Sequence, residues 1–276
     1  MHHATDTLTA NDGTQLFTQR WLPDAPRGAL VIAHGYAEHS GRYADFAQFL
    51  VQHDFAVYAL DHRGHGRSSG ERANVKVFRA FVDDLSRFLE FVRERHPQPP
   101  RFLLGHSMGG IVAAQLALER PHLVEGLILS APFFQNAVKV PPPLLAVSGV
   151  VSRFLPSWPT LKIDTDLLSR DQAVVEAYEA DPLVYTGGTK ARLGTEMLAA
   201  GNYVIERADS VTCPLLMLLG TADGIADPAG GKRFFDRASS EDKTSKLYEG
   251  FYHELLNEPK KEEVYRDVLE WLHLHL

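Results

Sequence analysis

The residues around Ser107 form the most informative motif in the chain. Residues 105–110, GHSMGG, match the pattern G-x-S-x-G, in which a serine hydroxyl stands exposed on a tight turn between a strand and a helix. An apolar run precedes the motif and an Ala/Leu-rich segment follows it, as this arrangement requires. Gly105 and Gly109 lack the Cβ atoms that would collide where the strand and the helix cross. The motif predicts that Ser107 is a nucleophile.

A serine nucleophile needs a base, and the base needs an acid that orients it. When the serine lies on such a turn, the chain order is serine, acid, histidine. Asp223 and His253 each follow closely after a predicted strand, in that order. Asp227 is the competing acid, but its position before Pro228 is typical of the start of a helix. We therefore predict a catalytic triad of Ser107, Asp223 and His253.

Two backbone N–H groups are predicted to stabilise the oxyanion that such a serine would create. One belongs to the residue after the nucleophile, Met108, and the other to the loop after the third strand. Tyr36 lies in that loop, and Gly35 allows its backbone to approach closely. His34, in the same loop, is expected to support it through a hydrogen bond.

His62 and His65 are the strongest candidates for a metal site. They lie in residues 61–68, DHRGHGRS, without a third ligand at a suitable spacing, and two arginines in the same loop would repel a cation. We therefore expect a structural loop, no metal and no cofactor. The single cysteine, Cys213, excludes an internal disulfide and a CxxC site.

Short apolar runs alternate with amphipathic helical patterns along most of the chain. The predicted strands are Ala29–Ala33, Ala56–Leu60, Phe102–Leu104, Leu127–Leu129, Leu215–Leu219 and Ser245–Tyr248, after an opening hairpin in residues 5–20. The predicted helices of this part are residues 43–53, 78–95, 108–120 and 260–276. This alternation indicates an α/β fold with a mostly parallel central sheet flanked by helices.

The alternation stops between residues 132 and 207. Prolines interrupt this segment, and helical patterns at 172–180 and 193–206 take the place of buried strands. We predict a helical cap insertion at residues 132–207, above the strand ends, and a core made of residues 1–131 and 208–276. The alternative is that these helices only cover a face of the sheet.

Charge and hydropathy exclude several classes of partner and location. The formal net charge of −7 disfavours nucleic acid, whose phosphates need a basic face. Residues 1–20 are polar and lack the apolar centre of a secretory signal. The longest apolar stretch, residues 138–158, is broken by prolines and Arg153, which disfavours a membrane-spanning helix. We expect a cytoplasmic protein.

Four blocks of sequence together resemble the serine α/β-hydrolases, and within them the monoacylglycerol lipase and lysophospholipase group. The blocks are residues 34–43, 61–68, 105–110 and 248–253, and the likeness runs from about residue 14 to the carboxyl end. The resemblance implies the α/β-hydrolase fold, the same triad and the same oxyanion N–H groups. It also implies contacts with the glycerol end of a substrate by Glu38, Arg42 and Tyr178. Leu256 departs from the pattern, because some relatives carry a second histidine there.

The activity implied by the resemblance is cleavage of monoacylglycerols to fatty acid and glycerol through an acyl-enzyme. Lysophospholipase or broad carboxylesterase activity would use the same machinery with a different pocket. Transfer of the acyl group to an acceptor other than water is a third option, and a non-catalytic binding module is a fourth. A module of that kind would be expected to lack a triad member, and none is missing here.

An apolar stripe in the predicted cap suggests how a lipid ester would reach the site. Its members recur at helical spacing and are Leu144, Val147, Val151, Phe154 and Leu155. We expect one side of this helix to line an acyl tunnel and the other to contact a membrane or micelle surface transiently, at the periphery of the membrane. Packing on the core would explain the same stripe.

Overall fold

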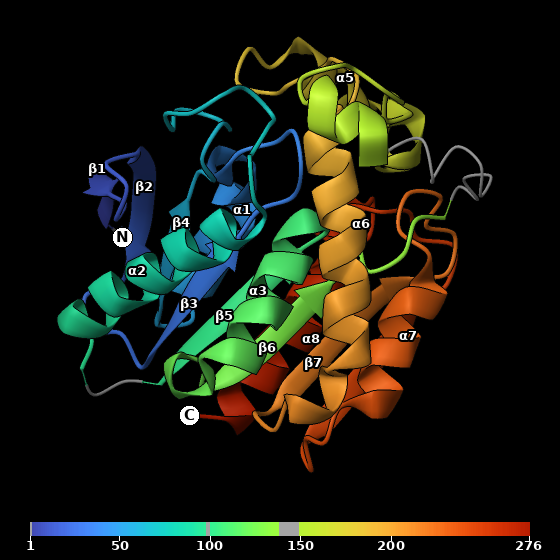
Figure 1. The fold of residues 1–276 in the computed structure, drawn as a ribbon. Coiled ribbons are helices and arrows are strands. Elements are labelled where there is room, and N and C mark those ends of the chain that lie inside the picture. The colour runs from blue at the N-terminus through green and yellow to red at the C-terminus, as the bar shows by residue number, and fades with distance from the viewer. Residues whose placement is uncertain (1, 98–99, 138–148) are drawn as a thin grey trace.

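The computed structural model describes residues 2–97, 100–137 and 149–276, and within them a single eight-stranded sheet forms the centre of the protein (Figure 1). Its strand order is β1-β2-β4-β3-β5-β6-β7-β8. β1 pairs antiparallel with β2, and β2 with β4, whereas the other neighbours are parallel. The strands are β1 (His2–Thr9), β2 (Gln15–Leu22), β3 (Gly28–Ala33), β4 (Phe55–Leu60), β5 (Arg101–His106), β6 (Gly126–Ser130), β7 (Leu215–Gly220) and β8 (Lys243–Tyr248). The opening hairpin and the mostly parallel sheet are confirmed.

Helices cover both faces of the sheet. In the described residues they are α1 (Ala44–Val51), α2 (Arg79–Arg95), α3 (Met108–Glu119), α5 (Gln172–Ala180), α6 (Ala191–Glu206), α7 (Pro228–Arg237) and α8 (Lys261–Leu274). Side chains of α2, α3, α6 and α7 share one apolar core with the sheet, and α1 and α8 share the other. α7 was not among the expected helices, because its apolar positions are few, although Asp227-Pro228 marks its start in the sequence.

Each buried strand supplies residues to both cores in alternation. Leu30 and Ile32 of β3 belong to the core under α1 and α8, whereas Val31 and Ala33 belong to the core under α2 and α3. Every residue of β3 is buried, which explains why its sequence is continuously apolar. The pairing of Ala33 with Gly105 places the ends of β3 and β5 side by side. Loops after the parallel strands therefore meet at one edge of the sheet.

The helices α5 and α6 of the segment between β6 and β7 lie in different positions relative to the sheet. In Figure 1, α5 lies above the edge where the parallel strands end, whereas α6 runs back down beside the sheet. α6 packs against α3 and α7. The described part of this segment contains no named strand and makes only the isolated bridges Asn136–Ala226 and Pro159–Lys190. The division into a cap at 132–207 and a two-part core stays a prediction, since α6 also covers a face of the sheet.

Part of the predicted apolar stripe lies outside the described residues. Leu144 and Val147 fall in that part, whereas residues 149–154 are helical. No helix of the described chain is long and apolar enough to cross a membrane.

The crossing of β3, β5 and α3 leaves no room for side chains at two glycines. A Cβ atom on Gly105 would lie 2.4 Å from the carbonyl oxygen of Gly109. A Cβ atom on Gly109 would lie 2.1 Å from the carbonyl oxygen of Ala33. Both contacts are with backbone atoms, which cannot move aside without shifting a strand or a helix. The close approach of these elements therefore depends on glycine.

We expect Gly109→Ala to lower the free energy of unfolding by about 3 kcal/mol or more, because the added methyl overpacks a rigid crossing. Urea unfolding followed by circular dichroism measures the change. Gly194→Ala is the matched control: its Cβ would meet only a side-chain methyl at 3.4 Å, inside α6. That substitution should be neutral or stabilise by about 0.5–1 kcal/mol. Equal midpoints for wild type and Gly109→Ala would contradict the explanation.

Candidate active site

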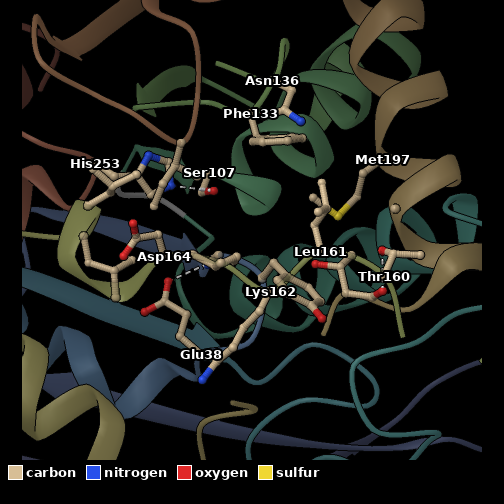
Figure 2. Close-up of a pocket in the computed structure, with 18 of the residues that line it drawn as sticks. Glu38, Ser107, Phe133, Asn136, Thr160, Leu161, Lys162, Asp164, Met197 and His253 are labelled. Carbon is tan, nitrogen blue, oxygen red and sulfur yellow. Dashed lines mark hydrogen bonds between the residues drawn. The ribbon is translucent and has the colours of Figure 1, made fainter. Parts of the chain in front are cut away.

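Ser107, His253 and Asp223 form a continuous chain of hydrogen bonds. The Ser107 hydroxyl donates to Nε2 of His253, with 2.8 Å between Oγ and Nε2 (Figure 2). Nδ1 of His253 donates to Oδ2 of Asp223, also at 2.8 Å. All three residues follow directly or closely after parallel strands, namely β5, β7 and β8. The structure thus brings together three residues that are up to 146 positions apart.

Backbone amides fix the orientation of Asp223. Its Oδ1 accepts hydrogen bonds from the N–H groups of Ile225 and Ala226, at 2.8 and 2.9 Å, which leaves Oδ2 for His253. Asp227 has another role, because its carboxylate caps α7 by accepting from the N–H of Ala229. Of the two candidate acids, the structure therefore places Asp223 on the histidine.

Electrostatic interactions in the site raise the pKa of His253. Burial would lower the pKa of His253, but the adjacent Asp223 carboxylate, together with the nearby Glu254 and Glu38, outweighs burial and raises that pKa above its usual value. The ring of His106 lies 4.9 Å away and is also buried. Burial, followed by the proximity of His253, lowers the pKa of His106 to about 4. His106 is therefore neutral at pH 7, and Nδ1 donates to the carbonyl of Ser130.

Ser107 has a strained backbone at the start of a helix. Its φ of 51° and ψ of −118° lie outside the regions that residues other than glycine usually adopt. α3 begins at Met108, so the N–H of Met108 has no acceptor within that helix. A Cβ atom on Gly35 would lie 3.2 Å from Cβ of Ser107, and Tyr36 lines the same cavity as Ser107. Both predicted donors thus belong to segments beside Ser107, while their role toward an oxyanion stays a prediction.

A cavity of about 520 Å³ opens in front of Ser107. Figure 2 shows Ser107 and His253 together at one side, with Leu161 and Met197 across from them. Most of the lining is apolar and includes Phe133, Val151, Trp158, Leu161, Met197, Leu198 and Ile225. Several of these residues come from the segment between β6 and β7. The size and the apolar lining are those of a site for a small molecule with a hydrocarbon part.

A buried ionic cluster lies beside the triad. Glu38 and Tyr178 line the cavity, but Arg42 does not. The guanidinium of Arg42 instead pairs with Glu38 and with both oxygens of Glu254, and it lies 4.7 Å from the centre of the Tyr178 ring. Arg42 is thus held by two carboxylates, and its contact with the glycerol end of a substrate stays a prediction. Sequence reasoning missed Glu254, whose only signal is its position next to His253.

The histidines of residues 61–68 are buried and support the neighbouring loop. Nε2 of His34 accepts a hydrogen bond from the N–H of His62 at 2.9 Å, and its Nδ1 donates to the carbonyl of Gly35. The rings of His62 and His65 pack around His34. Among the described residues, no group of three or more His, Cys, Asp or Glu side chains has an arrangement that would hold a metal ion. The expected hydrogen-bonding role of His34 is therefore present in the structure.

Comparisons with known proteins identify relatives over nearly the whole chain. The family model Hydrolase_4, described as serine aminopeptidase, S33, matches residues 24–260. A monoacylglycerol lipase of Mycolicibacterium smegmatis is 40% identical over 265 residues, which cover 96% of this chain and 95% of the relative. The monoglyceride lipase of Homo sapiens is 37% identical, with coverage of 96% and 89%.

Solved structures share the fold of this chain. The monoacylglycerol lipase of Paleococcus ferrophilus superposes with a TM-score of 0.84 at 33% identity, over 95% of this chain and 99% of that chain. A soluble variant of the monoglyceride lipase of Saccharomyces cerevisiae, in complex with a substrate analog, gives a TM-score of 0.88 at 23% identity, over 100% and 95%. At that identity the second likeness concerns the fold alone.

Proposed function

Since the chain belongs to the Hydrolase_4 family of serine α/β-hydrolases, and within it to the monoglyceride lipase group, we propose that it hydrolyses monoacylglycerols to fatty acid and glycerol. The observation that carries this proposal is the chain of two 2.8 Å hydrogen bonds from Asp223 through His253 to Ser107, at the end of an apolar cavity. The hydrogen bonds supply an ester-cleaving nucleophile, and the cavity accommodates an acyl chain.

Acylation begins when the Ser107 oxygen attacks the ester carbonyl. Nε2 of His253 takes the hydroxyl proton as the new bond forms, and Asp223 stabilises the resulting imidazolium. The N–H groups of Met108 and Tyr36 hold the negative charge that develops on the carbonyl oxygen. The tetrahedral intermediate then collapses, and the glycerol oxygen leaves with the proton from His253.

Deacylation repeats these steps with water. His253 removes a proton from a water molecule, whose oxygen attacks the acyl-enzyme carbonyl, and Ser107 leaves with that proton. The strained backbone of Ser107 holds its oxygen at the cavity surface in both halves of the reaction. Every proton moves between side chains, substrate and water, so the reaction needs no cofactor.

We expect Ser107→Ala to lower kcat on a monoacylglycerol by on the order of a millionfold, and Asp223→Asn by on the order of ten-thousandfold, because the asparagine cannot stabilise the imidazolium. Hydrolysis assays and labelling with a fluorophosphonate probe measure both losses. Asp227→Asn is the matched control: it changes an acid four positions away that caps α7, and it should retain most of the activity. Probe labelling that persists in Ser107→Ala would refute the assignment of the nucleophile.

The pH dependence of kcat/KM follows from the raised pKa of His253. His253 must be neutral to accept the Ser107 proton, so activity should fall as the pH drops through that raised pKa, with a midpoint above 6.5. Asp223→Asn removes the main cause of the increase in the pKa of His253. The residual activity should therefore fall at a lower pH than the wild-type activity does. A wild-type midpoint well below 6.5 would contradict this account.

Lysophospholipase or carboxylesterase activity is the second candidate, because the same machinery serves any accessible acyl ester. Comparing kcat/KM over monoacylglycerols, lysophospholipids and nitrophenyl esters of graded chain length separates the candidates. Short soluble esters that exceed every glyceride by orders of magnitude would leave a hydrolase but not a lipase. The cytoplasmic location inferred from the sequence stays a prediction.

An exposed apolar patch supports transient contact of the segment above the cavity with a lipid surface. Large apolar side chains there are more than half exposed, namely Val150, Phe154, Leu155, Trp158 and Leu161. Trp158 and Leu161 also line the cavity, so the patch continues to its wall. Exposed apolar patches of this kind typically mark interaction surfaces. A monoacylglycerol in a micelle or membrane would reach Ser107 along this route.

We expect the double variant Phe154→Ser/Leu155→Ser to bind phosphatidylcholine vesicles on the order of tenfold or more weakly, because two exposed apolar side chains no longer enter the lipid. Neither residue lines the cavity, so hydrolysis of a soluble short-chain ester should change little. Leu274→Ser, at an 81% exposed leucine of α8, is the control and should bind vesicles like wild type. Cosedimentation with vesicles measures the difference, and equal binding by all three proteins would disprove the contact.

A further inference from the structure

The ionic cluster beside the triad holds more negative than positive charge. Arg42 Nη1 lies 2.5 Å from Oε1 of Glu254, and Nη2 lies 2.7 Å from Oε2, so the pair is bidentate. Nη1 also donates to Oε2 of Glu38 at 2.9 Å. The two glutamate side chains are 4% exposed and the arginine side chain is 10% exposed. One guanidinium is thus shared between two buried carboxylates.

Further donors form hydrogen bonds with both carboxylates. Oε1 of Glu38 accepts from the N–H of Gly35 at 2.6 Å and from the hydroxyl of Tyr43 at 2.7 Å. Burial opposes the charge of Glu38, but Arg42, the neighbouring histidines and these hydrogen bonds lower its pKa to about 2. Oε2 of Glu254 also accepts from the side-chain amide of Asn257 at 2.9 Å. Hydrogen bonds of this kind stabilise the charged form of a carboxyl group.

The uncompensated charge faces the substrate. Glu38 and Glu254 line the cavity with Ser107, whereas Arg42 is not among the lining residues. Together with Asp223 they set three carboxylates against one guanidinium, which leaves two net negative charges. The transfer of a proton from Ser107 to His253 creates one charge of each sign, so this balance holds throughout the reaction. Among the described lining residues, the other charged side chains are Lys162 and Asp164, which are exposed and of opposite sign.

A substrate alcohol cannot pass beyond these carboxylates. Glu38, His106 and Glu254 also border a second void, of only about 10 Å³, on their other side. The remaining residues that line it are Tyr43, Leu256 and Asn257. A void of that size holds at most about one water molecule. A bound ester therefore cannot extend past the carboxylates, and we place its alcohol end there because the rest of the cavity lining is mostly apolar and suits the acyl chain.

We propose that Glu254 is a specificity-determining residue that makes the enzyme select acyl esters by the charge of their alcohol, an inference that rests on the proposed ester hydrolysis. Esters of cationic amino alcohols, such as choline, are substrates in addition to neutral glycerides. Esters of anionic alcohols are rejected. By cancelling Arg42, Glu254 prevents the guanidinium from attracting a carboxylate or phosphate. Without the carboxylate of Glu254, the net charge of the same site would be one unit more positive.

The size of the effect follows from Coulomb attraction. One unit charge at about 8 Å, with an effective dielectric constant of about 20, changes binding on the order of 30-fold. Three butyryl esters test this, with the alcohols choline, glycerol and glycerate. Glycerate differs from glycerol only by a carboxylate in place of a CH₂OH group. Butyryl esters are used below their micellar concentrations, so the charge of an aggregate surface plays no part.

For the wild-type enzyme we expect kcat/KM on butyrylglycerol to exceed that on butyrylglycerate by on the order of 30-fold or more. Glu254→Gln keeps the size of the side chain and part of its hydrogen bonding but removes the charge. It should raise the glycerate-to-glycerol ratio of kcat/KM by about 30-fold and lower the choline-to-glycerol ratio by a similar factor. Intrinsic differences in ester reactivity cancel when ratios are compared between variants.

Two controls separate charge from packing. Glu254→Asp shortens the side chain but retains its charge, so both ratios should stay close to wild type even if overall activity falls. Asp164→Asn removes an exposed charge of the cavity lining and should leave both ratios unchanged. A loss of selectivity in Glu254→Asp equal to that in Glu254→Gln would overturn the proposal in favour of a packing role.

The wild-type measurements distinguish failure of the charge selection from failure of the proposed function. Equal kcat/KM on butyrylglycerol and butyrylglycerate overturns the charge selection and leaves the proposed function intact. Inactivity on all three esters and on longer-chain monoacylglycerols overturns the proposed function and the charge selection with it. Strong preference for the neutral and cationic esters, relaxed only when the charge at position 254 is removed, supports the assignment of Glu254.

Discussion

The parallel pairing of β3, β5, β6, β7 and β8 is the constraint on which the rest of this structure depends. Parallel strands end at a common edge, so the loops that follow them share one small region of space. Ser107, Asp223 and His253 are the residues that three of these loops place within hydrogen-bonding distance of one another. The glycines at 105 and 109 allow α3 to approach that edge, so that its first N–H groups lie beside the strained serine. A change in the crossing of strand and helix would displace Ser107 and these N–H groups together.

Asp223 and the pair Glu38 and Glu254 are buried carboxylates near His253, and they differ in the positive charge that compensates them. Asp223 is matched by the proton that His253 gains during the proposed reaction, and two backbone amides hold it in place. Glu38 and Glu254 are matched by a permanent cation, Arg42, which they share. Buried ion pairs are costly to assemble and contribute little net stability. A cluster of this kind is therefore better explained by what it does to a bound alcohol than by what it adds to folding.

Much of the fold and of the candidate site could be predicted from local sequence patterns. The strand–turn–helix around Ser107 is visible because each of its parts has a strong short-range signature. The acid at 223 could be preferred over that at 227 because a proline after an acidic residue marks a helix start, and Asp227 does cap α7. α7 itself was missed, because its composition is polar and only Gly230, Gly231 and Phe234 of its residues are buried. The pairing of Arg42 with Glu254 could not be predicted, because the two residues lie 212 positions apart in the chain.

The sequence by itself determined the features that short stretches of chain encode: the alternation of strands and helices, the glycines of the tight turn, and the order of nucleophile, acid and base. These follow from steric and periodic rules that act over a few residues. Only the tertiary structure decided which charges meet, how Arg42 is shared, and which side chains of the segment between β6 and β7 line the cavity. Such contacts join residues far apart in the chain, and their free energies depend on burial and on distances that no local pattern contains.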